Sequence, residues 1–533
     1  MKHVKKLLSA VLVLVLALTM VLPVAAAEDG TTYSIKIKND NDDHTYEAYQ
    51  IFAGDLATDE NGATVLSNIT WGSGVNSSGL GEAKDYAATI TESNAAEKAK
   101  ELAGKLTSEI AGTANAKTNI SFAGTTVQGY EITGLTPGYY LVKDKDGSLD
   151  ANEHDAYTAY ILQVVQDVEA TPKSSVPSVD KEVKDNVDGT ENEEWREDAD
   201  HAINEPFQFK LTATLPADAN FADYATYEVV FKDTMSAGVT FDGIASVVVK
   251  KTGAESGTTL NDSQYVLDGV SAGDAGATWS LTINDIKSII GAGNFTNGVT
   301  VEVIYDAHLN ENAIKNNASV VGGTTDNTNN NKVELEYSNN PNGKGHGKTP
   351  EDYVWVFTYE VDNTKVIGGT GTRDEHGNLT GATPLAGAGF RLYDSTGNTE
   401  IGLTFDENLD AYRPIKGDEE TTEMTSAETT GKFNIVGLDA GTYILKETNT
   451  PDGYNTCADV TITIGANHQE QTSGSAVDMT LNEGSTMNNQ IENNKGTTLP
   501  GTGGIGTTIF YVVGGILVVG AAVLLIAKKR TRM

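Results

Sequence analysis

Several lysine, carboxylate and asparagine side chains fall on strand faces whose other members are apolar. Residues two apart in a β-strand share one face, so parity along the chain tells which side chains point into a core. Valines flank Lys181 on its face, and apolar residues precede both Asp233 and Glu447 on theirs. An unpaired charge on a core face is costly, so these positions call for a chemical explanation.

The unusual positions form two sets with the same order along the chain: a lysine, then an acid, then an asparagine. The sets are Lys181, Asp233 and Asn339, and Lys365, Glu447 and Asn493. The first asparagine is ambiguous, because Asn331 has the same parity at the start of the strand that Asn339 ends. Any one of these residues could instead sit at a strand end and reach solvent. The repeated order favours a shared chemical role.

The chemistry that fits such a trio is amide formation. A desolvated lysine has a lowered pKa and becomes a neutral nucleophile, whereas a desolvated carboxyl has a raised pKa and can stay protonated. The acid can polarise the asparagine carbonyl and shuttle protons while the lysine nitrogen attacks and ammonia leaves. A dry core supplies the proximity that this slow reaction needs. The product is a Lys–Asn isopeptide bond between two strands.

The elements that must hold these side chains are mostly strands. Alternating apolar residues recur along the chain, and clusters of Gly, Asn and Asp separate them. Residues 82–110 are rich in Ala, Lys and Glu and predict one helix. The expected fold class is therefore all-β, built of tandem immunoglobulin-like sandwich domains with one helical insertion in the first.

An internal repeat and two linkers divide the chain. Gly134–Asp144 parallels Gly437–Glu447, which indicates two related sandwich domains near the two ends. Segments rich in Pro, Gly and Asn at residues 171–177 and 339–350 are typical of linkers. The predicted parts are listed in order by residue number: 1–27, 28–172, 173–349, 350–498 and 499–533.

The composition excludes several classes of function. The 533 residues carry 37 Lys+Arg against 74 Asp+Glu, a net charge of −37, so nucleic acid is not an expected partner. One cysteine, Cys457, rules out a disulfide framework, and the histidines show no metal-ligand spacing. We expect no metal and no cofactor, and we expect the thiol to be packed or idle.

Both ends of the chain look like export signals. Residues 1–27 combine a basic start, an apolar run and an Ala-Ala-Ala end, as in a cleaved signal peptide. Residues 507–527 are apolar and precede a basic tail, which predicts a transmembrane helix with a cytoplasmic end. Just before this run stand Leu499, Pro500, Gly501, Thr502 and Gly503. Without both ends, 30 basic residues face 74 acidic ones, a net charge of −44.

These motifs resemble those of sortase-assembled backbone pilins of Gram-positive bacteria. The pentapeptide, apolar run and tail are similar to the LPXTG sorting signal, and Tyr443–Tyr454 resembles the E-box of such pilins. The resemblance implies sortase cleavage after Thr502 and makes Glu447 the proton-shuttling acid that joins Lys365 to Asn493. It likewise implies an isopeptide-forming middle domain, with Asp233 as its acid, and a C-terminal domain of the collagen-adhesin B (SpaA-like) type.

The resemblance further implies a function. Lys173, in a Pro-Lys pair ahead of the Lys181 strand, corresponds to the pilin lysine that attacks the next subunit, although Thr171 stands where an aromatic residue is usual. The chain would then be a pilus shaft subunit rather than an enzyme, secreted and anchored to the cell wall. Its expected partners are polymerising and housekeeping sortases, identical subunits, minor pilins, peptidoglycan and host surface ligands. The alternative is a wall-anchored adhesin or minor pilin that does not polymerise.

The first domain departs from this pattern. Asp144 occupies the position that corresponds to Glu447 in the repeat, but residues 157–173 contain no asparagine to complete a trio. We therefore predict no isopeptide bond in this domain and expect Asp144 to lie on the surface.

Overall fold

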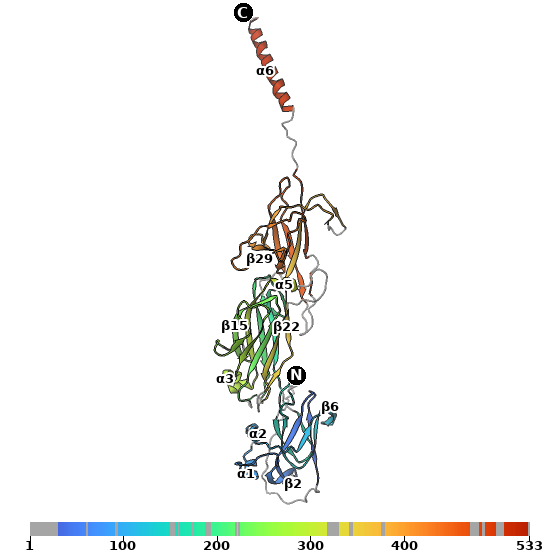
Figure 1. The fold of residues 1–533 in the computed structure, drawn as a ribbon, viewed down its shortest axis with the longest axis vertical. Coiled ribbons are helices and arrows are strands. Elements are labelled where there is room, and N and C mark those ends of the chain that lie inside the picture. Colours follow the sequence, from blue (N-terminus) through green and yellow to red (C-terminus); the bar gives the residue numbers. More distant parts are fainter. Residues whose placement is uncertain are drawn as a thin grey trace, which may run out of the picture. The chain divides into compact units, whose positions relative to one another are not determined.

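The computed structural model describes residues 30–496 and 506–530, apart from gaps at 60–61, 91–93, 150–154, 158, 172–174, 187–192, 219–220, 222–223, 317–329, 341–344, 375–378, 469–478 and 482–484. The described chain is mainly β, with several sheets and few helices, as Figure 1 shows. It forms two compact units. The first comprises Met1–Tyr359, Gly437–Ala440 and Gly465–Asn482, and the second Glu360–Val436, Gly441–Ile464 and Glu483–Met533.

The N-terminal domain, residues 33–170 of the first unit, contains two sheets. One has the order β5 (Thr118–Phe122), β6 (Thr125–Leu135), β1 (Tyr33–Lys38) and β9 (Val168–Ala170). The other has the order β3 (Thr64–Trp71), β2 (Tyr46–Thr58), β7 (Gly138–Asp144) and β8 (Ala159–Val164), and β4 (Gly112–Ala114) pairs with β2. The repeat segment forms β7, whose apolar residues are buried on both faces.

The predicted helix of residues 82–110 is wrong in its extent. The structure has two short helices in its place, α1 (Ala83–Ala87) and α2 (Ala95–Ala103). The first helix ends in a turn in which the Thr89 hydroxyl and the Ile90 N–H bond back to the carbonyls of Tyr86 and Ala87. Such β-branched residues favour the end of a helix over its continuation, and Asn94 then donates its side-chain amide to the Thr89 carbonyl.

The middle domain, residues 178–357 of the first unit, is a six-stranded and a seven-stranded sheet around one apolar core. The first sheet has the order β11 (Glu193–Arg196), β10 (Ser178–Asn186), β13 (Pro206–Leu215), β19 (Val299–Leu309), β15 (Val239–Lys251) and β16 (Thr258–Thr259). The second has the order β12 (Asp198–Asp200), β22 (Asp352–Phe357), β20 (Asn330–Ser338), β14 (Val229–Met235), β18 (Thr278–Ile283) and β17 (Val266–Asp268), with β21 (His346–Lys348) beside β20. Helices α3 (Ile286–Ile290), α4 (Ala292–Phe295) and α5 (Glu311–Asn316) lie in the connections.

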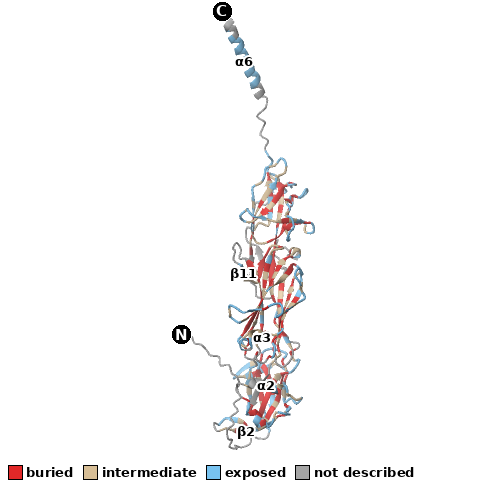
Figure 2. Cartoon of the chain, turned by 90° about the vertical axis from the view of Figure 1, so that its left-hand side faces the viewer, coloured by how far each residue is buried: buried red, intermediate tan, exposed pale blue. Residues whose placement is uncertain are grey.

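Alternation of buried and half-exposed residues explains why these strands face one core. Along β13, β19 and β20 buried side chains alternate with half-exposed ones, apart from the three buried residues that begin β19. Figure 2 shows buried residues in red along the strands of the described domains. Strand β22 belongs to this domain, because it pairs with β20 and, in parallel, with β12. The second compact unit begins at Glu360, after this strand.

The C-terminal domain, the second unit, is built on two five-stranded sheets. The first has the order β28 (Leu403–Asp406), β29 (Ala411–Pro414), β31 (Ile435–Leu438), β23 (Tyr359–Ile367) and β36 (Asn488–Asn493). The second has the order β27 (Glu400–Ile401), β26 (Gly389–Tyr393), β32 (Gly441–Asn449) and β33 (Val460–Ile464), with β30 (Met424–Thr425) beside β26. A further pair in this unit is β24 (Thr372–Arg373) with β25 (Leu379–Thr380), whereas the pair of β34 (Ala466–His468) with β35 (Met479–Leu481) belongs to the first unit.

The apolar run near the end of the chain forms helix α6 (Gly506–Arg530). Among the described residues, no helix is long and apolar enough to cross a membrane, so the structure does not bear out the predicted transmembrane helix. The predicted signal peptide, residues 1–27, lies outside the described residues.

Candidate functional site

The middle domain brings a lysine, an acid and an asparagine together inside its core. Lys181 comes from β10 of the six-stranded sheet, whereas Asp233 and Asn331 come from β14 and β20 of the opposite sheet. Strands β14 and β20 are antiparallel neighbours, and their register sets Asp233 opposite Val333 and Met235 opposite Asn331. The two side chains therefore lie on one face, and the lysine reaches them from the other sheet.

The contacts in this middle trio are direct. Lys181 Nζ forms an ion pair with Asp233 and donates to the Tyr305 hydroxyl at 3.1 Å. That hydroxyl donates to Asp233 Oδ1 at 3.3 Å and accepts from Asn331 Nδ2 at 2.5 Å. Lys181, Asp233 and Asn331 are all fully buried. The Asn331 Oδ1 atom has no partner among the described residues, so its carbonyl is available to a proton donor.

Burial shifts the two titratable groups toward their neutral forms. It lowers the pKa of Lys181 and raises the pKa of Asp233, and in each case desolvation outweighs the attraction of the opposite charge. The same proton can therefore rest on the carboxyl and leave the amine neutral. The rings of Phe209 and Tyr305 lie 5.1 Å and 5.3 Å from Lys181 Nζ and keep water away from it.

Asn339, the first choice from the sequence, lies elsewhere. Its side-chain Nδ2 donates to the backbone carbonyl of Asp155 at 3.2 Å, and its backbone carbonyl accepts from the backbone N–H of Tyr157. Asn339 is six positions beyond Val333 along the chain, about 20 Å at the rise of a strand, so it is out of reach of Asp233. Parity was correct for both asparagines, and the register of β14 with β20 brings Asn331 to the trio.

The C-terminal domain holds the second trio, in which the side chains of the lysine and the acid are again fully buried. Lys365 Nζ donates to Asn493 Oδ1 at 2.6 Å, and Asn493 Nδ2 donates to Glu447 Oε1 at 2.6 Å. The lysine nitrogen lies 3.6 Å from the same Glu447 oxygen, with both side chains at 0% exposure. Lys365 and Asn493 come from the parallel neighbours β23 and β36, and Glu447 from β32 of the other sheet.

Burial also shapes the second trio. It lowers the pKa of Lys365, although nearby Cys457 and Glu447 act in the opposite direction. The Phe390 ring lies 5.0 Å from the lysine nitrogen. Cys457 contacts the acid of this trio through its backbone, whose N–H donates to Glu447 Oε2 at 2.7 Å. The two Glu447 oxygens are thus fixed, one toward the asparagine and one toward the Cys457 backbone.

Sequence reasoning missed the residues that surround the trios. The chief omission is Tyr305, whose hydroxyl touches Lys181, Asp233 and Asn331. A signal for it exists, because Tyr305 alternates with Val301, Val303 and Ala307 on a buried face of β19 and brings a hydroxyl to that face. The contact of Cys457 with Glu447 had no such signal, since Cys457 lies in a connection between strands.

The N-terminal domain corrects the expectation for Asp144, which is buried and not on the surface. Its Oδ1 lies 2.8 Å from His44 Nδ1, and Asp155 Oδ2 lies 2.8 Å from His44 Nε2. Burial alone would lower the pKa of His44, but the hydrogen bonds to the two carboxylates outweigh it and raise the pKa to about 9. A charged imidazolium is therefore the partner of Asp144 in this domain.

The remaining predicted site residues lie outside the described residues. These are Lys173 and the pentapeptide Leu499, Pro500, Gly501, Thr502 and Gly503.

Two family models match the C-terminal part of the chain. The prealbumin-like fold domain SpaA matches residues 373–478, which include Glu447, and the LPXTG cell wall anchor motif matches residues 491–531, which include Asn493. The trypsin-resistant surface T6 protein of Streptococcus pyogenes serotype M6 is 24% identical over 95% of this chain and 96% of its own length. The chain thus carries a SpaA prealbumin-like domain and an LPXTG cell wall anchor motif, and it is similar to this streptococcal surface protein over nearly its whole length.

A second relative and a solved structure are also similar to the chain. The fimbrial subunit type 1 of Actinomyces viscosus is 26% identical over 68% of the chain and 66% of its own length. The solved structure of the T6 backbone pilin of S. pyogenes, described as a modular three-domain structure, has a TM-score of 0.50 at 18% identity. The match covers 89% of this chain and 100% of the solved chain, and at this identity it supports the fold. The LPXTG motif indicates that the chain is anchored to the cell wall of a Gram-positive bacterium.

Proposed function

We propose that this chain is a backbone pilin and that it closes two internal isopeptide bonds, Lys181–Asn331 and Lys365–Asn493. The observation that carries the proposal is the second trio, in which the nucleophile, the amide and the acid lie within 3.6 Å of one another at 0% exposure. The middle trio repeats the residue types with a different acid, Asp233, and adds the Tyr305 hydroxyl.

The proposed reaction balances without a cofactor. The neutral lysine amine attacks the Cγ atom of asparagine, and the protonated acid donates to the amide oxygen as charge develops there. The acid then takes a proton from the attacking nitrogen and passes it to the departing nitrogen, which leaves as ammonia. As the carbonyl re-forms, the acid takes back the proton that it gave to the amide oxygen. One C–N bond forms and one breaks, and the acid is regenerated. Each site reacts once, because its lysine and asparagine are consumed.

Peptide mapping tests the choice of asparagine in the middle domain. Digestion of the exported chain, residues 28–502, should give one branched peptide that joins Lys181 to Asn331 and another that joins Lys365 to Asn493. The variant Asn331→Ala should lose the first branched peptide, and the matched variant Asn339→Ala should keep it. A Lys181 branch that survives in Asn331→Ala but disappears in Asn339→Ala would show that the assignment is wrong.

We also infer how subunits join. The sequence supports a sortase-made bond between the Thr502 carbonyl of one subunit and Lys173 of the next, after loss of Gly503 and the residues beyond it. On this basis the paired sheets of each domain act as immunoglobulin-like sandwich modules of a shaft, with polymerising and housekeeping sortases, minor pilins and peptidoglycan as partners. The exported chain is strongly acidic and would repel the phosphates of a nucleic acid, so we propose no nucleic-acid partner.

Denaturing gels of wall extracts test this linkage. Wild-type cells should show a ladder of covalent multimers, Lys173→Arg should show monomer only, and Lys143→Arg, which alters an exposed ion pair with Asp146, should keep the ladder. A ladder in Lys173→Arg would move the linkage to another lysine. Monomer alone in wild-type extracts would instead favour the non-polymerising adhesin or minor pilin.

A further inference from the structure

A second carboxylate, that of Asp352, holds the backbone of the lysine in the middle trio. The backbone N–H of Lys181 donates to Asp352 Oδ2 at 2.7 Å. Lys181 lies on β10 of the six-stranded sheet, whereas Asp352 begins β22 of the seven-stranded sheet. The hydrogen bond therefore joins the two sheets through residues that are 171 positions apart in the chain, and one of them is the nucleophile of the proposed reaction.

Asp352 lies in one row with the acid of the trio. The register of β14, β20 and β22 sets Asp233 opposite Val333, and Val333 opposite Asp352. Directly opposite residues of neighbouring strands share a face, and all three residues are buried, with Asp352 only 6% exposed. Two carboxylates on the inner face of one sheet thus hold a single lysine of the other sheet. Asp233 contacts its Nζ, and Asp352 contacts its backbone.

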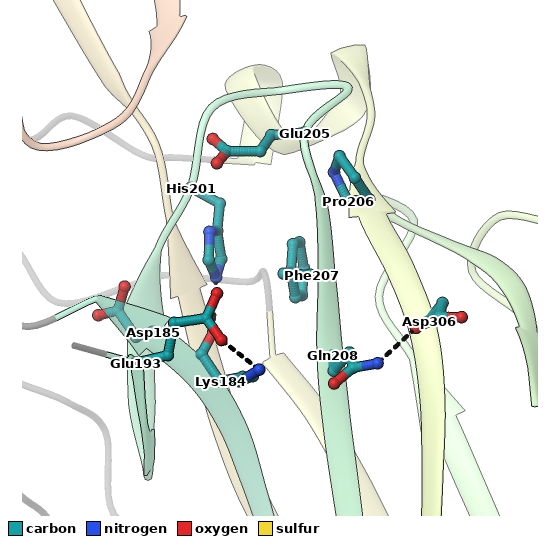
Figure 3. A pocket seen from close by; sticks show the side chains of 9 residues that line it. All are labelled: Lys184, Asp185, Glu193, His201, Glu205, Pro206, Phe207, Gln208 and Asp306. Atoms are coloured by element: carbon teal, nitrogen blue, oxygen red, sulfur yellow. Dashed lines mark hydrogen bonds and ion pairs between the residues drawn. The ribbon is translucent and has the colours of Figure 1, made fainter. Parts of the chain in front are cut away.

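The position of Lys181 on β10 explains why an acceptor is needed there. Strand β11 pairs with β10, on the side away from β13, only from Val183 onward. Figure 3 shows this paired part, where Lys184 of β10 forms an ion pair with Glu193 of β11 beside a cavity of about 310 Å³. At Lys181 that edge has no paired strand among the described residues, so a backbone N–H that points to it needs an acceptor from elsewhere. Asp352 supplies one to Lys181.

The charge of Asp352 opposes the proposed reaction, whereas its hydrogen bond favours it. Burial lowers the pKa of Lys181, and Asp233 and Asp352 both act in the opposite direction. The charge of Asp352 therefore stabilises the charged lysine, although the nucleophile must be neutral. If Asp352 assists closure of the bond, it does so through its hydrogen bond to the backbone and not through its charge.

The stem of a lysine is flexible, so contacts at Nζ alone do not fix the position of its Cα atom. An error of about 1 Å in the position of a reacting atom can cost about 100-fold in rate. A hydrogen bond between the sheets resists sliding of one sheet over the other at this point. We propose that Asp352 is a positioning residue for the Lys181–Asn331 bond, which holds β10 so that Nζ reaches Asn331 and Asp233. This inference rests on the proposed function, because it assigns a role in the same reaction.

Two variants of Asp352 separate the hydrogen bond from the charge. Asp352→Asn keeps an acceptor for the backbone N–H and removes the charge, and Asp352→Leu removes both while it keeps a similar shape. The measurement is the time course of the Lys181–Asn331 branched peptide in freshly refolded exported chain, with the Lys365–Asn493 peptide as the internal standard. Asp352→Leu should close the bond at least about 10-fold more slowly than the wild type. Asp352→Asn should close it at the wild-type rate or faster.

The matched control is Asp285→Leu. Asp285 lies in the connection between β18 and α3 of the same domain and also accepts a backbone N–H, that of Tyr227, at 3.1 Å. This variant loses a comparable hydrogen bond and should still close the bond at the wild-type rate. The melting temperature of the middle domain in an Asn331→Ala background, where the bond cannot form, shows whether each variant folds. If Asp352→Leu does not fold, Asp352→Ser replaces it, because a hydroxyl one bond shorter should slow closure in the same way.

Three results would overturn the inference alone. These are closure in Asp352→Leu at the wild-type rate, faster closure in both Asp352 variants, and a loss in Asp352→Asn as large as that in Asp352→Leu. A wild-type chain that never forms the Lys181–Asn331 peptide would overturn the proposed function of the middle trio, and this inference with it.

Discussion

The Tyr305 hydroxyl is the residue-scale feature that most distinguishes the middle trio. It joins Lys181, Asp233 and Asn331 in one hydrogen-bonded group. In the second trio the asparagine donates directly to the acid, Glu447, with no tyrosine between them. Because the hydroxyl can relay a proton between acid and amide, its loss should slow the reaction without removing any reactant.

The variant Tyr305→Phe should form the Lys181–Asn331 bond about 100-fold more slowly, a typical loss for one preorganised donor, and the Lys365–Asn493 bond at the normal rate. The measurement is the time course of ammonia loss from freshly refolded chain. Tyr337→Phe is the matched control, because that hydroxyl is also buried but has no partner among the described residues. Equal rates in Tyr305→Phe and wild type would remove the hydroxyl from the mechanism.

At the scale of elements, strand β7 shows how one repeat supports different chemistry. Asp144 ends β7 at the repeat position that Glu447 occupies in β32, yet its partner is His44, between β1 and β2. The imidazolium is also bonded to Asp155, stacks on Tyr46 and meets the edge of Tyr130. An ionic triad therefore ties the strands of this domain where a covalent bond is proposed in the C-terminal domain.

The triad predicts a loss of stability in alkali. The folded pKa of His44, about 9, exceeds the unfolded value of about 6.5, so its contribution is complete below pH 6.5 and is lost as the pH rises through 9. The full shift corresponds to about 3 kcal/mol. Calorimetry should show the N-terminal domain melting at lower temperature at pH 9.5 than at pH 6.

The variant His44→Gln should abolish most of that pH dependence. His308→Gln, which removes a more exposed histidine paired with Asp242, should preserve it. If the wild-type melting temperature of the N-terminal domain is the same at both pH values, the triad does not carry the charge assigned to it.

Much of the site could be predicted from the sequence because parity reports which face a side chain occupies. Lys181, Asp233, Lys365 and Asn493 are buried as parity indicated. Parity cannot tell how far along a strand two residues meet, since that depends on pairing with a strand distant in sequence. The choice between Asn331 and Asn339 was therefore undecided, and Asp144 was misplaced because its partner His44 lies 100 residues away.

At the scale of the whole molecule, the proposed bonds act on two different connections. Lys181–Asn331 would link the two sheets of the middle domain, and Lys365–Asn493 would link the neighbouring strands β23 and β36, 128 residues apart in the chain. A chain with one cysteine has no disulfide available for this purpose. Covalent closure of such long loops restricts the unfolded chain.

Loss of the second bond should lower the free energy of unfolding of the C-terminal domain by about 5 kcal/mol, if the loop-entropy relation for disulfides applies. The variant Glu447→Gln tests this, since it keeps the size of the side chain but removes the proton shuttle. Its C-terminal domain should unfold at lower temperature and be cut faster by trypsin, while the middle domain is unchanged. An unchanged melting temperature would mean that the bond adds no stability.

The intact mass of the purified exported chain tests the central claim most directly. The account predicts a mass lower than that of the sequence by two ammonia molecules. It predicts a deficit of one ammonia in either Asp233→Asn or Glu447→Gln, and none in the double variant. A wild-type chain at its full calculated mass would contradict the account, because it would mean that neither buried trio forms a bond.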